Sequence, residues 1–349
     1  MTVERRKLEH IDIISTKDVS HDYNFWDDID IVQRSMPEVD FDEIDTSTTF
    51  LGKRLKLPFL ISSMTGGHPE TKRINENLAR GAAEAGIAMG VGSERAAIQN
   101  REMGRTYSVV TDYDVPFRIA NVGAPQLIKQ SKNALSDEEI DYAVGLVKAD
   151  ALAVHFNFVQ EMSQPEGDRN SKGIKKRLGK LSKRYKVIAK ETGAGFSLQD
   201  ALDFKQLGVS AIDTGGRSGT SFAAVESLRS KNRSDERKER IGKTFWNWGI
   251  PSPICLIYAN VELPLIASGG VRTGLDVFRG LAMGASLGGL ASTFLKAALQ
   301  SDKEVSNLIS HLETELKTAM FLTGCTNLDD IRKVRKIYRG RLLEWLNQI

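Results

Sequence analysis

Residues 151–168 read ALAVHFNFVQEMSQPEGD, and this stretch decides the fold that the sequence predicts. Its first four residues, 151–154, are apolar, which is typical of a short buried strand. The polar side chains of His155, Asn157, Gln160 and Glu161 follow, and turn-forming residues come after them. A buried strand that ends in a polar cluster on a loop is where an α/β barrel carries its chemistry. Solvated polar residues at an ordinary strand end are the alternative interpretation.

Further apolar segments repeat on both sides of this strand, which we count as the fourth. They lie at residues 58–62, 88–92, 117–120, 187–189, 211–213, 265–268 and 285–290. Helical segments are predicted between them at 69–85, 136–148, 197–207 and 273–282. Ser136 and Glu139 have the spacing of a capping box, and Ser197 is a second expected cap.

Strands that alternate with helices indicate βαβ units and a parallel sheet. Eight short apolar strands favour closure into an α/β TIM (β/α)8 barrel. An open, doubly wound sheet is the alternative, but it would place a glycine fingerprint after the first strand. Gly66 and Gly67 lack the G-x-G-x-x-G spacing of that fingerprint, which counts against the open sheet.

The chain of 349 residues fits one barrel of about 250 residues with additions at both ends. We expect a single domain, residues 1–349, made of an N-terminal extension (1–56), the barrel (57–300) and C-terminal helices (301–349, with helices at 303–322 and 327–346). The basic segment 172–186 is expected to be a helix or a loop. The mixed charge of residues 228–243 predicts an exposed, mobile loop.

The composition is that of an ordinary globular protein, with 41% apolar and 27% charged residues. A net charge of +3 is too small to indicate a nucleic-acid partner. The two cysteines, Cys255 and Cys325, cannot form a disulfide framework and lack zinc-site spacing. No apolar run approaches the roughly 20 residues that span a bilayer, and the charged start MTVERRKLEH does not resemble a signal peptide. We therefore expect a cytoplasmic protein with no membrane partner.

Glycines at the seventh and eighth strand ends predict a phosphate site. The sequence there reads Gly269-Gly270-Val271-Arg272 and, after the last strand, Ala291-Ser292. Barrels commonly bind phosphate between these two loops, where glycines expose backbone N–H groups and a helix begins. Arg272 would add a charge-assisted contact. A tight turn with a surface arginine is the alternative.

Other strand ends predict a flavin. Lys190 ends the fifth strand, and a lysine buried there needs an anion partner such as the N1/O2 edge of a reduced flavin. Asn121 and Ser93 are expected to bond other ring edges. Backbone groups of Ser63, Met64 and Thr65 are expected against the ring, and the sixth loop adds Thr220. The agreement among six strand ends supports this prediction.

With these residues in place, the chain resembles the type 2 isopentenyl-diphosphate isomerases, the FMN-dependent class. The resemblance covers nearly the whole chain through RKLEHI (6–11), SSMTGG (62–67), GVGSERAAI (90–98), NVGAPQL (121–127), HFNFVQEMSQPEGDRN (155–170), KETGAGFS (190–197), DTGGRSGTSFAAVE (213–226), FWNWGIP (245–251) and ASGGVRTGLDV (267–277). The set is specific as a whole, whereas the SGG-x-R piece is common to many FMN barrels.

This resemblance implies an isomerase of isoprenoid biosynthesis that interconverts isopentenyl and dimethylallyl diphosphate without net redox change. It implies FMN reduced by NADPH or NADH, and Mg2+. The family positions of the FMN contacts are Ser63, Met64, Thr65, Ser93, Asn121, Lys190, Thr220, Gly270, Val271, Arg272, Ala291 and Ser292. Those of the substrate contacts are Arg6, Lys7, Arg95, His155, Asn157 and Gln160, with Glu161 as metal ligand and His155, Gln160 and Glu226 as catalytic residues.

One position departs from the expected pattern. Glu94 stands between Ser93 and Arg95, where we expect an uncharged residue, and it brings a negative charge near the diphosphate site. The expected partners are a small diphosphate and further copies of the chain in a homo-oligomer, either a tetramer or an octamer. A diphosphate needs cations, and Arg6, Lys7, Arg95 and Mg2+ would supply them.

No side chain is suited to protonate an alkene carbon, so reduced FMN is predicted to act as the acid and base. Three alternatives remain at this point. The first is an FMN oxidoreductase of the hydroxy-acid oxidase type on the same barrel. The second, a thiol-dependent barrel dehydrogenase, needs a loop cysteine, whereas Cys255 lies in an expected helix. The third is a non-catalytic flavin or phosphate carrier, which would not need Glu161 or the cluster around His155.

Overall fold

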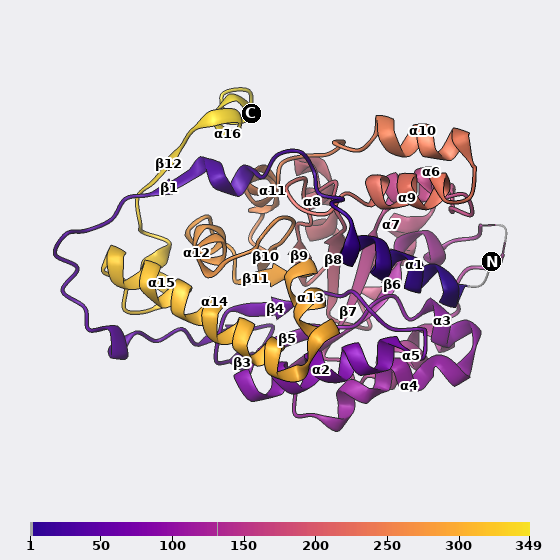
Figure 1. The fold of residues 1–349 in the computed structure, drawn as a ribbon, viewed down its shortest axis with the longest axis horizontal. Coiled ribbons are helices and arrows are strands. Elements are labelled where there is room, and N and C mark those ends of the chain that lie inside the picture. The colour runs from indigo at the N-terminus through magenta and orange to yellow at the C-terminus, as the bar shows by residue number, and fades with distance from the viewer. Residues whose placement is uncertain (1–2, 131) are drawn as a thin grey trace.

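Among residues 3–130 and 132–349, which the computed structural model describes, eight parallel strands close into a barrel (Figure 1). They are β4 (Phe59–Ile61), β5 (Ala88–Gly90), β6 (Phe117–Gly123), β7 (Ala151–Phe156), β8 (Val187–Glu191), β9 (Ala211–Asp213), β10 (Leu265–Ala267) and β11 (Leu287–Leu290). The barrel closes where β11 pairs with β4, with Gly288 opposite Phe59. The TIM barrel and its eight strands are confirmed, and the open sheet is excluded.

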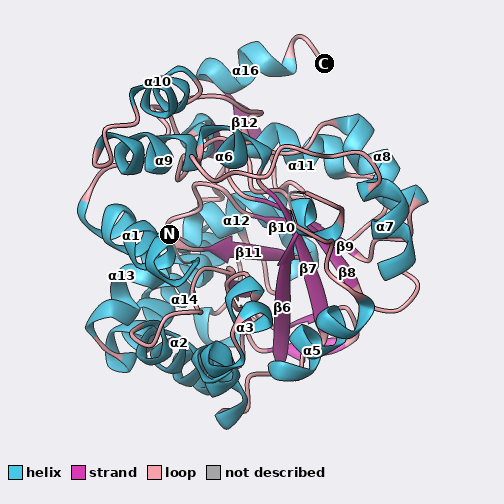
Figure 2. Ribbon diagram, turned by 90° about the vertical axis from the view of Figure 1, so that its right-hand side faces the viewer, coloured by secondary structure: helices cyan, strands magenta, loops and turns pink. Residues whose placement is uncertain are grey.

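Helices surround the strands, as Figure 2 shows. The expected ones are α2 (Thr71–Ala85), α5 (Asp137–Leu146), α8 (Leu198–Gln206) and α12 (Gly274–Ala282), and the basic segment forms α7 (Ile174–Leu181). Ser136 closes the predicted capping box, and Ser197, predicted as a cap, also closes a capping box. Further helices are α3 (Arg95–Gln99), α4 (Arg105–Ser108), α6 (Phe158–Ser163), α11 (Ser252–Ala259) and α13 (Ser292–Gln300), with 3-10 turns η3 (Arg101–Gly104), η4 (Val109–Asp112) and η5 (Ala124–Leu127).

The N-terminal extension is part of the core. It forms α1 (Val3–Thr16), η1 (Phe25–Asp28), β1 (Ile29–Ile31), η2 (Phe41–Glu43) and the hairpin of β2 (Thr48–Phe50) and β3 (Lys53–Leu55). Phe25 and Trp26 are completely buried, and the Trp26 indole N–H donates to the carbonyl oxygen of Gly269 at 2.8 Å. Burying an aromatic side chain of this size stabilises the fold by about 1.5–3 kcal/mol.

The hairpin closes one end of the barrel. Phe50 packs edge-on against Phe117, the first residue of β6, with ring centroids 5.4 Å apart. Both side chains belong to the apolar cluster that fills the barrel interior together with Leu60 and Ile266. Because this packing seals the amino ends of the strands, the opposite, carboxyl ends carry the polar side chains described below.

The prediction of a mobile loop over residues 228–243 is wrong. The segment contains the end of α9 (Phe222–Lys231) and most of α10 (Glu236–Thr244). Its two buried cations have partners, because Arg229, only 1% exposed, lies among carboxylates and the Lys238 ammonium donates to the carbonyl oxygen of Met162 at 2.6 Å. Paired charges allow a charged segment to form packed helices.

The C-terminal prediction is correct in its first half. Helix α14 (Asp302–Thr323) matches the expected helix and packs on α2 and α12. The single helix expected over 327–346 is wrong, because the chain forms α15 (Leu328–Ile331), β12 (Lys336–Tyr338) and α16 (Gly340–Leu346). Strand β12 pairs antiparallel with β1, which the sequence could not reveal locally. No helix among the described residues is both long and apolar enough to cross a membrane.

Candidate active site

A cavity of about 790 Å³ lies at the carboxyl ends of the barrel strands, and helix α1 lines one side of it. Of the site residues predicted from the sequence, all but Glu226 line this cavity: Arg6, Lys7, Ser63, Met64, Thr65, Ser93, Arg95, Asn121, His155, Asn157, Gln160, Glu161, Lys190, Thr220, Gly270, Val271, Arg272, Ala291 and Ser292. Residues that are more than 280 positions apart in the sequence therefore share one site.

His155 is held as a neutral imidazole at the end of β7. Its Nδ1 lies 2.8 Å from Oδ1 of Asn121, whose amide nitrogen donates to the carbonyl oxygen of Val91 at 3.2 Å. Nδ1 therefore carries the ring proton, which leaves Nε2 as an acceptor. Burial, followed by the positive charge of Lys190, lowers the pKa of His155 to about 3.

Two cations of helix α1 face the cavity near this histidine. The Lys7 ammonium donates to the carbonyl oxygen of Ser93 and to the hydroxyl of Tyr107, each at 2.6 Å. Burial, together with the charge of Arg6, lowers the pKa of Lys7 to about 7. Burial and the nearby Arg95 also lower the pKa of Arg6. An anion bound here would relieve the repulsion within this cationic group.

The side chains of the neighbouring residues Arg95 and Glu94 have different partners. Arg95 pairs with Asp168, with 3.2 Å between Nη1 and Oδ2. Glu94 is completely buried and accepts the backbone N–H of Asn121 at 2.8 Å, while its Oε1 has no hydrogen-bond partner among the described residues. Burial raises the pKa of Glu94 well above its usual range. The carboxyl group therefore takes up a proton more readily than an ordinary glutamate, and Arg95 is not paired with it.

Glu161 is the expected metal ligand, and its carboxylate is ordered by its neighbours. Oε1 accepts from the Asn157 amide at 3.0 Å and Oε2 accepts the backbone N–H of Asp168 at 2.7 Å. Burial raises the pKa of Glu161. The buried Oδ1 of Asn157 has no partner among the described residues. This oxygen-rich group fits a hard cation such as Mg2+, which often binds few protein carboxylates and completes its shell with water and substrate phosphate.

Lys190 has an anion partner that the sequence analysis did not identify. Its ammonium lies 2.8 Å from Oδ2 of Asp213 on the neighbouring strand β9. The other oxygen of Asp213 accepts from the hydroxyl of Ser268. The pairing of Lys190 with Asp213 in the β8–β9 register brings the two charges together, and the lysine still lines the cavity.

The two loops predicted to bind phosphate follow β10 and β11, and their backbone conformation is suited to close approach of a ligand. Gly269 and Gly270 adopt φ values of 84° and 83°, and a Cβ on Gly270 would lie 2.4 Å from the carbonyl oxygen of Ser218. Ser292 begins α13, so free N–H groups of that helix face the same region. The side chain of Arg272 is half-exposed and pairs with Asp27 at 2.5 Å. Its charge is therefore shared with a carboxylate.

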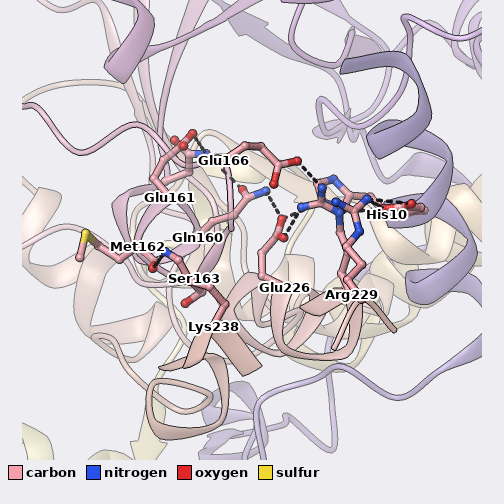
Figure 3. Close-up of polar contacts among 12 residues, drawn as sticks. His10, Gln160, Glu161, Met162, Ser163, Glu166, Glu226, Arg229 and Lys238 are labelled. Atoms are coloured by element: carbon pink, nitrogen blue, oxygen red, sulfur yellow. Dashed lines mark hydrogen bonds and ion pairs between the residues drawn. The ribbon is translucent and has the colours of Figure 1, made fainter. Parts of the chain in front are cut away.

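Glu226 lies behind the lining residues rather than on the cavity wall. Its Oε1 lies 2.8 Å from Nε2 of His10 and accepts from the Gln160 amide at 3.2 Å, as Figure 3 shows. Its Oε2 accepts from Nη1 of Arg229 at 2.6 Å. Burial alone would raise the pKa of Glu226, but His10 and then Arg229 outweigh it and lower the pKa to about 2. Glu226 is therefore an ionised hydrogen-bond acceptor for Gln160.

Sequence reasoning missed several residues of the site. His10 and Gln126 line the cavity, and Asp168 pairs with Arg95. His10 follows Arg6 by four positions, and that helical spacing could have placed it on the same face of α1. Gln126 bonds Asp168 at 3.2 Å, a contact between two loops that no local pattern indicates.

Comparisons with known proteins agree with this geometry. The family of FMN-dependent dehydrogenases matches residues 3–101 and 252–337. An isopentenyl-diphosphate delta-isomerase of Thermoplasma volcanium is 52% identical and one of Archaeoglobus fulgidus 43% identical, each alignment covering 99% of both chains.

Solved structures show the same fold at low sequence identity. A flavocytochrome b2 mutant superposes with a TM-score of 0.63 at 19% identity, covering 95% of this chain and 82% of that one. A mandelate oxidase mutant with an FMN adduct superposes with a TM-score of 0.60 at 15% identity, covering 95% and 92%.

Proposed function

The chain belongs to the FMN-dependent isopentenyl-diphosphate delta-isomerases, and from this membership we propose how the residues of its cavity act. The enzyme interconverts isopentenyl and dimethylallyl diphosphate and uses FMN. The proposal extends to Mg2+, to FMN reduced by NADPH or NADH, and to the roles of individual side chains. The oxidases and flavocytochromes share only the fold with this chain, so they carry no argument for an oxidase activity.

The observation that carries the substrate assignment is a pair of cations without carboxylate partners. Among the described residues, neither Arg6 nor Lys7 forms an ion pair, although both line the cavity. Partly buried cations favour an anion partner, and a diphosphate supplies several oxygens to two of them at once. Ile11 and Ile14 continue the same face of α1 along the cavity and offer apolar surface to a hydrocarbon tail.

Mg2+ would bind at Glu161 and bridge to the diphosphate. This proposal is supported by the ionisable carboxylate of Glu161 and by the unpartnered oxygen of Asn157 beside it. Among the described residues, no group of three or more His, Cys, Asp or Glu side chains could hold a metal ion. Substrate phosphate and water would therefore complete the magnesium shell.

FMN would lie along the strand ends, held by the residues predicted from the sequence, with Lys190 on the ring side and Gly270 and Ser292 at the phosphate. Reduced FMN, when bound, supplies proton exchange with the alkene carbon, chemistry that no side chain of the cavity offers. The imidazole of His155 is neutral, so its Nε2 can accept a hydrogen bond. Without a positive charge, it does not attract the diphosphate as Arg6 and Lys7 would.

Gln160 and Glu226 would hold the proton-transfer side of the site. Glu226 is ionised and accepts from Gln160, so it orients the Gln160 amide toward the cavity. His10 contacts the same oxygen of Glu226, Oε1, and also lines the cavity. The buried carboxylate of Glu226 can therefore stabilise a proton that His10 accepts at the cavity. General acid–base assistance of this kind is typically worth about 10²–10⁴ in rate.

One assay tests the proposal. Purified protein with FMN, Mg2+ and isopentenyl diphosphate is reduced once in a sealed anaerobic cell, and the dimethylallyl isomer is counted per flavin. Because the reaction has no net redox change, we expect many products per flavin after the single reduction. One product or fewer per flavin would mean stoichiometric hydride transfer and would overturn the acid–base role of the cofactor.

We also propose a cytoplasmic homo-oligomer, either a tetramer or an octamer. Large apolar side chains remain exposed at the surface, among them Trp248 at 59%, Leu198 and Leu202 at 47% and Phe245 at 38%. Exposed apolar groups of this size often mark contacts between subunits. Light scattering of the purified protein gives the mass directly, and a monomer would contradict the proposal.

A further inference from the structure

We infer that Arg229, which does not line the cavity, is a positioning residue that ties helix α1 to the orientation of Glu226. The inference rests on the proposed role of Glu226 in proton transfer. Figure 3 shows the guanidinium of Arg229 between α1 and the Glu226 side chain. Two parts of the site, the diphosphate residues on α1 and the Gln160–Glu226 pair, would then depend on one arginine.

Arg229 is a buried cation with carboxylates from three segments of the chain. Its Nε donates to Glu9 of α1 at 2.8 Å and its Nη1 to Glu226 of α9 at 2.6 Å. Its Nη2 donates to Glu166, in the loop after α6. The side chain is 1% exposed, so its charge depends on these partners rather than on water. The planar fork of a guanidinium can satisfy several carboxylates at fixed directions, which an ammonium cannot.

The two carboxylate oxygens of Glu226 contact different residues. Oε2 is taken by Arg229, so Oε1 is left for His10 and Gln160. When the Gln164 amide is oriented to satisfy its neighbours, it also bridges Oε1 of Glu226 and Nη1 of Arg6, at 3.3 Å and 3.0 Å. Without Arg229, the carboxylate would lose the contact that fixes its direction.

The same arginine fixes the position of α1. Glu9 and His10 are adjacent on this helix, and they bind Arg229 and Glu226 respectively. Arg6 and Lys7 lie one turn earlier on α1 and line the cavity. A small apolar cluster that includes Ile13 and Val225 completes the contact between α1 and α9. The observed position of α1 and the orientation of Glu226 therefore favour each other.

The electrostatic surroundings of Glu226 are mixed. The groups that act on it are His10 and Arg6 from α1, Arg229 from α9, Lys238 from α10, and Glu166 as the neighbouring carboxylate across Arg229. Arg229 has the shortest contact with Glu226 among these cations. Removing an opposite charge at such a distance typically raises the pKa of a carboxyl group by about 1–3 units.

The experiment compares Arg229→Met, Arg229→Lys and Glu9→Gln, with Arg233→Met as the matched control. Arg233 also pairs with Glu9, at 2.6 Å, but forms no ion pair with Glu226 among the described residues. For each variant, kcat and KM for isopentenyl diphosphate are measured against pH. Hydrogen exchange of the α1 backbone is measured with and without inorganic pyrophosphate, a readout that does not need turnover.

For Arg229→Met, we expect the acidic loss of kcat to move upward by about 1–3 pH units and pyrophosphate protection of α1 to be lost. Arg229→Lys should shift the acidic limb of the kcat–pH profile in the same direction, but by less. Glu9→Gln and Arg233→Met should raise KM and weaken the protection of α1 while the acidic limb stays in place. Arg229→Lys keeps the buried charge, so it carries the pH test if Arg229→Met fails to fold.

An unchanged acidic limb in both Arg229 variants, with an active parent enzyme, would reduce Arg229 to a structural ion pair and overturn the inference. If pyrophosphate protects the α1 backbone from hydrogen exchange equally well in Arg229→Met, then Arg229 does not link α1 to Glu226. That result would also overturn the inference. A parent enzyme that forms no dimethylallyl diphosphate would instead overturn the proposed function. The two failures are therefore distinguishable.

Discussion

The Nδ1 atom of His155 lies 2.8 Å from the side-chain oxygen of Asn121, and this contact sets the tautomer of a buried histidine at the centre of the site. The two residues lie on adjacent strands, with Gly123 opposite His155 in the β6–β7 register. The imidazole is surrounded by cations and cannot easily become one more. The contact therefore keeps an uncharged hydrogen-bond acceptor beside the cationic group on α1.

The first prediction concerns acid stability. The folded-state pKa of His155 is lowered from 6.5 to about 3, so in that range the unfolded chain binds a proton that the folded chain does not. His155 therefore makes the protein lose stability as the pH falls below about 6.5. Between about pH 6 and pH 4, this contribution lowers the free energy of unfolding of the parent by up to about 1.4 kcal/mol per pH unit. The variant His155→Gln should not show this part of the decrease. The measurement is urea unfolding across this range, with the exposed His311→Gln as control.

The second prediction concerns Glu94. Its folded-state pKa is raised well above 4.5, so the folded chain binds this proton more tightly, and stability falls as the pH rises. Glu94→Gln keeps an acceptor for the Asn121 N–H and removes the ionisation. We expect it to stabilise the protein more near pH 8 than near pH 4. The exposed Glu102→Gln is the control, and an equal effect at both pH values would contradict this account.

The third prediction separates stability from cofactor binding at Lys190. Lys190→Ala leaves Asp213 buried without its 2.8 Å partner, which should destabilise the fold by about 3–5 kcal/mol and weaken FMN retention. The double variant Lys190→Ala/Asp213→Ala should recover much of the stability but not the flavin. The flavin-to-protein ratio and the free energy of unfolding are measured together. Full flavin content in the double variant would remove Lys190 from the FMN site.

The fourth prediction concerns the metal. Glu161→Gln keeps the size of the side chain and its hydrogen bond to the Asp168 N–H but loses the negative charge. We expect the Mg2+ concentration for half-maximal activity to rise by about 10-fold or more while FMN stays bound, because a hard cation prefers a carboxylate. The exposed Glu138→Gln provides the control. A Mg2+ titration that overlays that of the parent would place the metal elsewhere.

The barrel was predictable because its signals are local. Each strand is a short apolar run, and parallel strands bring their carboxyl ends together, so polar residues as far apart as Ser63 and Ser292 could be assigned to one site. The capping boxes at Ser136 and Ser197 are equally local. Patterns of this kind depend only on neighbours within a few positions.

The errors arose where charges or strands find distant partners. The dense mixed charge of segment 228–243 predicts a mobile loop, whereas Arg229 is matched by Glu9 and Glu166 far away in the sequence. Lys190 was expected to rely on a flavin, but Asp213 on the next strand also neutralises it. The side chain of Glu226 was placed near the site by resemblance alone, and its hydrogen bond to Gln160 required the fold.

The pairing of β1 with β12 has a consequence for the order of folding. Ile29 lies opposite Tyr338, so this two-stranded sheet joins segments that are about 300 residues apart and are synthesised at different times. The last barrel strand ends at Leu290, well before β12 is made. Contacts that close such a long loop cost the most chain entropy and form late. Nascent chains should therefore form the barrel strands first and pair β1 with β12 last, so that the N-terminal segment after α1 is joined to the C-terminal segment only once the barrel strands have been made.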